Sequence, residues 1–326
     1  MSERTGVLFS TRDDLDLVIR AEELGYESAW TAEGQGRSAF GKLERWATVT
    51  SEIGLATGIV NVFARTPATT AMATATLDEH SNGRAILGLG VAHPGVVESY
   101  HGTPFNQPLD RLAEYVELVR RYLRGDEREF DGTFYTPTRT RFWDAFEPVR
   151  ESVPIYNAAL GPANVRLTGG RFDGWLPNLY PLDRFEEALG WLAAGAERAG
   201  RNVDELDVAM YVLVSVDDSS ETARAAAKYH IAYYLRDIPG YYGRVAENAG
   251  FEADVEAARA ATSTEEAARC LSDEFVDLLA VCGTPEEVTD GLSTLRNAGV
   301  DLPIVRAPVG ADIDAVERML TICAPR

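Results

Sequence analysis

Two ionisable side chains stand where a protein could use them to move a proton. Glu33 directly follows an apolar run at 28–32, and His93 comes soon after another at 84–90. A carboxylate can act as an acid or a base, and an imidazole changes charge close to neutral pH. The structural alternatives are a Glu33 that is exposed or pairs with Arg37, and a His93 that only caps a helix. Both residues are therefore candidates for proton transfer.

A possible phosphate site comes after the apolar run at 154–159. Gly161 and Pro162 open a predicted helix there, and the start of a helix offers free backbone N–H groups and the positive end of a dipole. Gly-Pro is also ordinary turn chemistry, so the pair indicates phosphate only in a suitable context. Arg37 and Arg65 could attract the anionic tail of a bound molecule.

Metal and nucleophile chemistry have no support in the sequence. No two histidines have metal-ligand spacing, and neither H-x-x-x-H nor the nucleophile motif G-x-S-x-G occurs. The three cysteines, Cys270, Cys282 and Cys323, lie too far apart for a zinc or redox motif and are interpreted as buried or idle thiols. We therefore expect no metal.

The chain is strongly acidic, with 51 Asp and Glu against 31 Lys and Arg and a net charge of −20. Only Lys42 and Lys228 are lysines. Such a surface repels itself in dilute buffer, and salt screens the repulsion, so the composition favours a salt-rich cytoplasm. A GC-rich genome would explain the arginines but not the acidic excess. Without a basic stripe, nucleic-acid binding is not expected.

Targeting and membrane signals are also missing from the printed sequence. No charged-then-apolar segment opens the chain, and the most apolar short run, at 85–92, is far too short to span a bilayer. We expect a cytoplasmic protein with no membrane partner.

Short apolar runs alternate with helical patterns along the chain, which is typical of βα units around a parallel sheet. Eight runs read as strands, the number that closes a (β/α)8 TIM barrel, and the barrel is expected to occupy residues 1–326 as one domain. Active sites of such barrels lie at the carboxyl ends of the strands. The predicted strands are 6–9, 28–32, 54–61, 84–90, 154–159, 174–178, 208–216 and 302–307.

Two segments exceed a bare barrel. Residues 229–282 are predicted to form a helical insertion between the seventh and eighth strands, and they carry a tyrosine cluster that either packs in a core or subunit contact or covers the pocket. Residues 124–152 are polar, with a small hairpin predicted around Asp131 and Gly132. Helix caps are predicted at Thr284 with Glu287, at Asp183 with Glu186 and at Asp218 with Glu221.

Five blocks in order resemble the luciferase-like oxidoreductase family, especially its branch that uses the deazaflavin coenzyme F420. They are "AEELGY" running into "AWTAE" at 21–33, "GLATGIVNVFARTP" at 54–67, "SNGRAILGLG" at 81–90, "AALGPANVRLTGGRFDGW" at 158–175 and "GTPEEV" from 283 through "AGV" at 298–300. Together they span nearly the whole barrel. The resemblance implies a luciferase-like TIM barrel that holds a flavin or deazaflavin.

The resemblance also assigns residues to the cofactor. A non-proline cis peptide behind the cofactor ring maps onto Gly58 and Ile59, where Gly58 has no side chain to block a flat ring. The phosphate loop maps onto residues 159–162, which strengthens the phosphate interpretation. The implied cofactor contacts are Gly58, Ile59, Asn61, Arg65, Val91, Ala92, Ala159, Leu160, Gly161 and Pro162.

Two positions depart from the family pattern. Glu33 is followed by Gly34, where many F420-dependent relatives carry a histidine, and His93 stands where some carry a glutamate proton donor. The known dehydrogenase mechanism of the family therefore does not transfer directly. Glu33 and His93 remain the two catalytic candidates.

The leading hypothesis is an F420-dependent oxidoreductase that exchanges a hydride with a small organic substrate, a methylene-pterin being one candidate. The alternatives are an FMN-dependent monooxygenase, a flavin-binding protein without catalysis, and an unrelated barrel hydrolase or isomerase. The family habit implies a homodimer, and the composition together with F420 favours a halophilic archaeon as the source.

Overall fold

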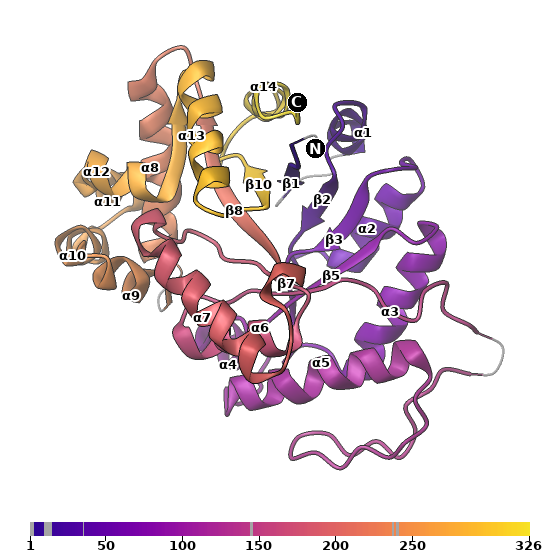
Figure 1. Cartoon of the computed structure of the whole chain (residues 1–326). Coiled ribbons are helices and arrows are strands. Elements are labelled where there is room, and N and C mark those ends of the chain that lie inside the picture. Colours follow the sequence, from indigo (N-terminus) through magenta and orange to yellow (C-terminus); the bar gives the residue numbers. More distant parts are fainter. Residues whose placement is uncertain (1–2, 10–14, 35, 144–145, 237, 239–240) are drawn as a thin grey trace.

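Eight parallel strands close into a barrel, which confirms the predicted fold (Figure 1). The computed structural model describes residues 3–9, 15–34, 36–143, 146–236, 238 and 241–326. The barrel strands are β1 (Gly6–Leu8), β2 (Ser28–Thr31), β3 (Gly54–Thr57) continued by β4 (Val60–Asn61), β5 (Ala85–Gly90), β6 (Ile155–Asn157), β7 (Gly174–Trp175), β8 (Asp207–Val216) and β10 (Leu302–Arg306). Pairing of β10 with both β1 and β8 closes the sheet.

The strand predicted at 54–61 is interrupted in its middle. β3 pairs with β5 through Leu55 and Ala56, and β4 pairs with the far end of β5. Between them the Gly58–Ile59 peptide is cis, as the family resemblance implied. The side chain of Thr57 bridges the interruption, since its hydroxyl donates to Gly88 O and accepts from Gly88 N.

Helices cover the outside of the barrel, and most of them connect one barrel strand to the next. They are α1 (Leu15–Glu23), α2 (Ala39–Ala47), α3 (Pro67–His80), α4 (Pro94–Ser99), α5 (Pro108–Arg124), α6 (Pro162–Arg171), α7 (Phe185–Arg198), α13 (Pro285–Asn297) and α14 (Ile313–Ile322). None of the helices among the described residues is both long and apolar enough to cross a bilayer.

Of the three predicted helix caps, one is formed and two are not. Thr284 and Glu287 form the predicted capping box of α13. The cap predicted at Asp183 is wrong, because a 3₁₀ turn at Leu182–Arg184 precedes α7 and leaves Arg184 at its N-cap without a side-chain bond. The cap predicted at Asp218 is also wrong: the hydroxyl of Ser219 accepts from Thr222 N instead.

Helices α8 (Ser220–Arg236), α9 (Tyr241–Asn248), α10 (Glu252–Ala260), α11 (Thr264–Cys270) and α12 (Asp273–Leu279) lie between β8 and β10, at one side of the barrel (Figure 1). The residues predicted to end the helical segment instead form β9 (Ala280–Gly283), which pairs with the last four residues of β8. α8 begins before the predicted start at residue 229. Ile231, Val255 and Phe275 join a hydrophobic cluster that these helices share.

The chain after α5 extends away from the barrel in Figure 1. The hairpin predicted around Asp131 and Gly132 does not form paired strands; the chain bends at residues 133–134, and Gly132 N donates to Tyr135 O at 3.0 Å. The carboxylate of Glu114 accepts from Thr133 N and Phe134 N at 2.7 and 2.9 Å. These backbone donors are therefore bonded to α5 and not to a partner strand.

The crossing of α6 and α7 provides a test of packing. An added Cβ at Gly195 would lie 2.0 Å from the carbonyl oxygen of Arg166, while one at Gly190 in the same helix would meet nothing within 4 Å. We predict that Gly195→Ala destabilises the protein by about 2–3 kcal/mol through overpacking. Gly190→Ala should stabilise it by up to about 1 kcal/mol, because alanine is the better helix former. Chemical denaturation of both variants measures the difference, and equal effects would contradict the close crossing.

Candidate active site

A cavity of about 690 Å³ opens at the carboxyl ends of the barrel strands. Its wall brings together ten of the twelve residues predicted for the site, drawn from the ends of β2 to β6. The exceptions are Asn61 and Arg65, which do not line it. The ten are Glu33, Gly58, Ile59, Val91, Ala92, His93, Ala159, Leu160, Gly161 and Pro162.

Aromatic side chains fill the barrel below the cavity. The ring of Trp30 makes edge contacts with Tyr156 and Tyr211 at centroid distances of 5.4 and 6.1 Å. A Cβ at Gly58 would lie 1.6 Å from the hydroxyl of Tyr211 and 3.2 Å from Trp30. Glycine is therefore required at position 58 because the tyrosine from across the barrel fills the space that a side chain would need, and not because that space is left open for a flat ring.

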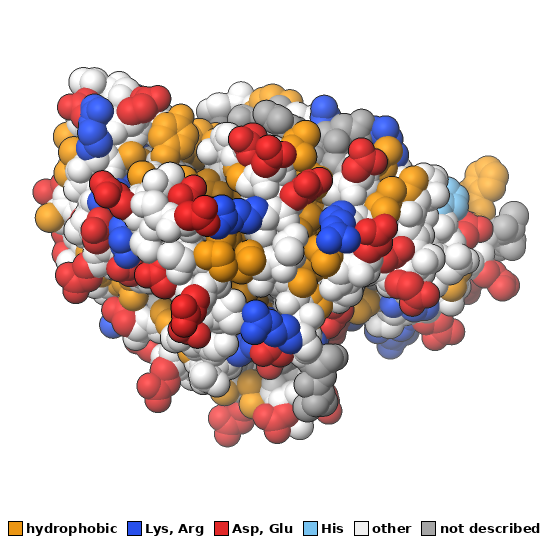
Figure 2. Space-filling view, turned by 90° about the horizontal axis from the view of Figure 1, so that it is seen from above, with side chains coloured by type: hydrophobic (Ala, Val, Ile, Leu, Met, Phe, Trp, Pro, Cys, Tyr) orange, Lys and Arg blue, Asp and Glu red, His pale blue; other side chains and the backbone are white. Residues whose placement is uncertain are grey.

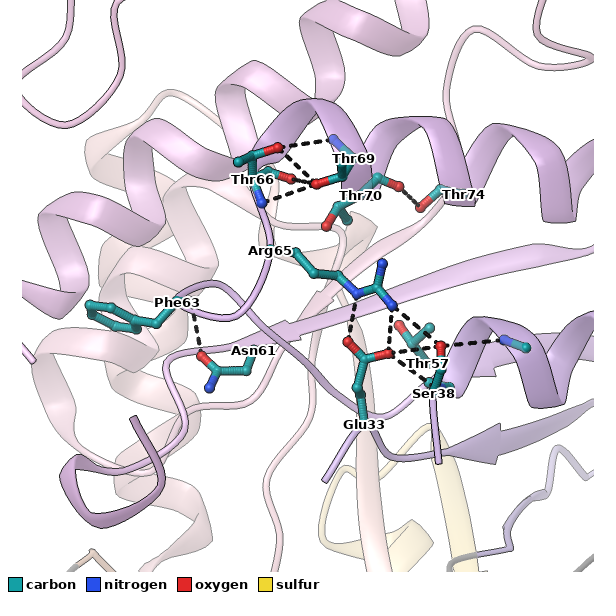
Figure 3. A network of polar contacts seen from close by, with 12 residues as sticks. Glu33, Ser38, Thr57, Asn61, Phe63, Arg65, Thr66, Thr69, Thr70 and Thr74 are labelled. Atoms are coloured by element: carbon teal, nitrogen blue, oxygen red, sulfur yellow. Dashed lines mark hydrogen bonds and ion pairs between the residues drawn. The ribbon is translucent and has the colours of Figure 1, made fainter. Parts of the chain in front are cut away.

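Glu33 is anchored by an ion pair (Figure 3). Arg65 donates to its two carboxylate oxygens, from Nε at 2.5 Å and from a terminal nitrogen at 2.9 Å, and Ala39 N and the hydroxyl of Ser38 donate to it as well. Burial raises the pKa of Glu33, but the hydrogen bonds and charge of Arg65 and the other donors outweigh burial and lower it. A carboxylate held in this ionised state is better suited to fixing a loop than to donating a proton.

Arg65 and Asn61 do not line the cavity but form bonds within the loops next to it. The guanidinium of Arg65 is engaged by Glu33 and Ser38 and lies 5.2 Å from the ring of Phe40. The side-chain oxygen of Asn61 accepts from Phe63 N at 2.9 Å, and Figure 3 shows this bond apart from the ion pair. Both residues thus shape the loop after β4.

His93 has the environment of a neutral imidazole. It is the N-cap residue of α4 by position, but its side chain makes no capping bond, and its buried Nδ1 has no hydrogen-bond partner among the described residues. Burial lowers its pKa from the ordinary value of 6.5. The preceding Ala92 adopts a left-handed conformation with φ of 55°, a strained turn that carries the chain from β5 over the cavity. His93 can therefore accept a proton at neutral pH.

The N-terminus of α6 faces the same cavity. Gly161 is its N-cap, Pro162 follows, and no side chain caps the helix. The first N–H groups of a helix lack partners within it, and the dipole favours negative charge there. A Cβ at Gly161 would meet nothing within 4 Å, so the approach to these donors is open. The arrangement suits a phosphate.

The opposite wall contains polar residues that sequence reasoning missed. Tyr211 lies in the middle of β8, Asn178 follows β7, and Arg306 ends β10, while Tyr234 and Tyr242 come from α8 and α9. Arg306 lies within the strand predicted at 302–307, but the sequence did not indicate that its side chain would line the cavity. The tyrosine cluster was noticed, and the structure places Tyr234, Tyr241 and Tyr242 on the cavity wall.

Metal and thiol chemistry have no site in the described part of the chain. Its His, Cys, Asp and Glu residues form no group of three that could hold a metal ion. The three cysteines are free, and burial raises the pKa of Cys282 to about 11 and that of Cys323 to about 12. Thiols with such raised pKa values are poor nucleophiles.

Residues 2–302 match the model of the family described as luciferase-like monooxygenase, and the chain belongs to this family. A 5,10-methylenetetrahydromethanopterin reductase of Archaeoglobus fulgidus is 32% identical over 301 residues, covering 90% of this chain and 88% of that protein. The enzyme of the same name from Methanolobus tindarius is 31% identical over 307 residues, covering 92% and 91%.

A solved structure agrees with these relatives. The coenzyme F420-dependent tetrahydromethanopterin reductase of Methanopyrus kandleri matches with a TM-score of 0.83 and 28% identity, covering 99% of this chain and 98% of that one. The barrel and its order of elements are therefore shared along nearly the whole length.

The ion pair of Glu33 predicts a pH-dependent contribution to stability. Because folding lowers the pKa of Glu33 from 4.5, its contribution is fully present above pH 4.5 and is lost as the pH falls through the folded value. Glu33→Gln should cost about 2 kcal/mol of unfolding free energy at neutral pH, and much less in acid. Urea unfolding of both proteins across this pH range tests the prediction.

Arg65→Met supplies the matched control. If the two side chains act as a pair, the double variant Glu33→Gln/Arg65→Met should lose clearly less stability than the two single losses added together. Additive losses, or a Glu33→Gln cost that does not change with pH, would contradict the pairing.

Proposed function

We propose that this protein is a coenzyme F420-dependent oxidoreductase that transfers a hydride between the deazaflavin and a small organic substrate. The observation that carries the proposal is one cavity whose wall combines the Gly58–Ile59 floor with the uncapped N-terminus of α6. The family relationship to F420-dependent reductases supports it.

The residues present fit the cofactor. The backbone of Gly58 would form the floor under the ring, with the hydroxyl of Tyr211 packed against it and Ile59, Val91 and Ala92 on the wall of the same cavity. The backbone donors at Gly161 and its neighbours would hold the phosphate, with Ala159, Leu160 and Pro162 shaping the loop. When bound, F420 supplies a ring carbon that gives or takes a hydride. Asn61 and Arg65 contribute by holding the loop that carries this wall.

The protein itself manages the proton. His93 lies on the wall, and burial lowers its pKa and keeps the imidazole neutral, so it is the residue that accepts or returns a proton at the substrate. Glu33, ionised and bonded to Arg65, keeps the loop after β2 in place. The apolar part of the wall excludes water from the reacting atoms.

The finer parts of the proposal concern substrate and setting. A methylene-pterin is the first substrate to test, because the relatives named above reduce such compounds according to their names. Acidic side chains are spread widely over the face seen in Figure 2, which supports a salt-rich cytoplasm. The proposal includes a homodimer, because the family resemblance implies one.

Cofactor binding tests the proposal directly. Titration of the purified protein in molar salt should give micromolar or tighter binding of oxidised F420 and much weaker binding of FMN. Gly161→Asp places a carboxylate at the helix N-cap, so it should weaken F420 binding by about tenfold or more through repulsion of the phosphate. The folded state should not suffer, because aspartate is a favoured N-cap.

Gly161→Asn is the control, since asparagine has the same size and is also a good N-cap but carries no charge. It should bind F420 more tightly than Gly161→Asp does. Equal affinities would remove the phosphate from this loop. Preference for FMN with oxygen consumption would indicate a monooxygenase, and tight binding without turnover of any substrate a non-catalytic flavin-binding protein.

The proton role of His93 has its own test. His93→Gln should lower kcat with an accepted substrate by about 100-fold or more while leaving F420 affinity unchanged within about twofold. Because burial lowers the pKa of His93 from 6.5, kcat/KM in the direction where it accepts a proton should decline only below pH 6.5. His101→Gln, a variant outside the cavity wall, should retain activity. An unchanged kcat in His93→Gln would assign the proton elsewhere.

A further inference from the structure

Arg306 is a buried cation that has no counter-charge in the described part of the chain. It ends β10, is only 5% exposed and lines the cavity. One terminal nitrogen donates to the hydroxyl of Tyr234 at 2.9 Å, whereas Nε has no partner, and no Asp or Glu among the described residues pairs with it. The guanidinium therefore keeps an edge available for a ligand.

The groups around Arg306 are neutral and rich in unused hydrogen-bonding capacity. Burial raises the pKa of Tyr211 well above its usual value, so its hydroxyl stays protonated, and this hydroxyl has no partner among the described residues. The amide nitrogen of Asn178 donates to the hydroxyl of Tyr242 at 3.0 Å, and the Asn178 side-chain oxygen accepts from none of the residues that the structure describes. Burial and the charge of Arg306 lower the pKa of His230, whose ring stacks on Tyr234 at 4.9 Å.

Physical chemistry makes this arrangement costly for folding alone. A buried charge normally pairs with an opposite charge, and a buried hydroxyl normally finds a partner. Here a cation and an O–H donor remain unsatisfied on the wall of one cavity. The combination is complementary to an oxyanion, because a guanidinium edge binds a carboxylate or phosphate through two parallel hydrogen bonds.

Arg306 lies on the wall opposite the proposed cofactor residues, and Tyr211 connects the two walls. β10 and β8 form the wall across the barrel from β4 and β5, and the hydroxyl of Tyr211 reaches from that wall to Gly58. A molecule anchored at Arg306 thus extends toward the Gly58–Ile59 floor. The N-terminus of α6 already provides for the phosphate of the cofactor, so the second anion site is open to the substrate.

We propose that Arg306, assisted by Tyr211 and Tyr234, forms a subsite for an oxyanion of the substrate, so that the substrates of this enzyme carry a carboxylate or a phosphate. The assignment of the ligand as substrate rests on the proposed oxidoreductase function. The subsite itself rests on the unpaired cation and hydroxyl. Its ligand is recognised by charge and by the planar shape of the guanidinium.

Binding of simple probes tests the subsite in the full-length protein. Calorimetric titrations at pH 7 would compare benzoate with its neutral analogue benzamide and with inorganic phosphate. Wild type should bind the better of the two anions at least about tenfold more tightly than benzamide. Arg306→Gln should abolish this preference, and Arg318→Gln, which removes a surface arginine paired with Asp218, should retain it.

The outcomes are distinct. A preference for benzoate assigns a carboxylate and a preference for phosphate assigns a phosphate ester, and either supports the subsite. Equal binding of benzoate, benzamide and phosphate by wild type would overturn it. So would Arg306→Gln unfolding at a lower temperature while keeping the anion preference, which is the result for a merely structural arginine.

F420 titrations of the same variants separate the two proposals. Arg306→Gln should bind F420 within about twofold of wild type, whereas a tenfold loss would place Arg306 in the cofactor site and overturn the substrate assignment. If wild type bound no F420 at all, the oxidoreductase proposal would fail, while the benzoate and benzamide comparison would still decide the anion subsite.

Discussion

The pairing of β8 with β10 is the interaction on which the rest of the structure depends. Residues Ala209 to Leu213 of β8 lie in parallel register with Leu302 to Arg306, and this ladder closes the barrel because β10 also pairs with β1. The same ladder sets Tyr211 opposite Ile304, two residues before Arg306. The strand pairing that closes the barrel therefore also places the polar residues of this wall.

The electrostatics of the cavity differ from those of the chain as a whole. The protein carries a net charge of −20, yet the cavity contains a helix N-terminus and Arg306, and the charge of Glu33 is balanced by Arg65. Exposed charges are screened over about 8 Å at physiological ionic strength. Anions are thus attracted only at short range, so the protein selects them by contact and not by long-range steering.

Local patterns explain which features could be predicted from the sequence. Strand alternation, the Thr284–Glu287 capping box and the loop at Gly161 each depend on residues close together in the chain. The short β9 could not be distinguished from helix, because its strand state depends on pairing with β8. The cap expected at Asp183 failed because a 3₁₀ turn occupies the approach to α7.

The same contrast between local patterns and contacts of distant residues applies to the candidate site. The residues that the family motifs assigned at Gly58, Ile59 and 159–162 line one cavity, whereas the partner of Glu33 lies 32 residues away and was not identified. The wall with Tyr211, Tyr234 and Arg306 joins three separate elements, and no local spacing reveals such a convergence. Side-chain direction at the ends of parallel strands is set by barrel closure, which a single sequence does not display.

The helices between β8 and β10 pack largely around their own hydrophobic cluster, with Ile231, Leu235 and Phe275 among its members, yet α8 and α9 also supply Tyr234 and Tyr242 to the cavity. Units with a core of their own can open separately from the remainder of a protein. A ligand that bridges this unit and the barrel would close that local opening. Amide hydrogen exchange in α8 and α9 would then slow on binding, while exchange in the barrel strands on the far side would stay as it was.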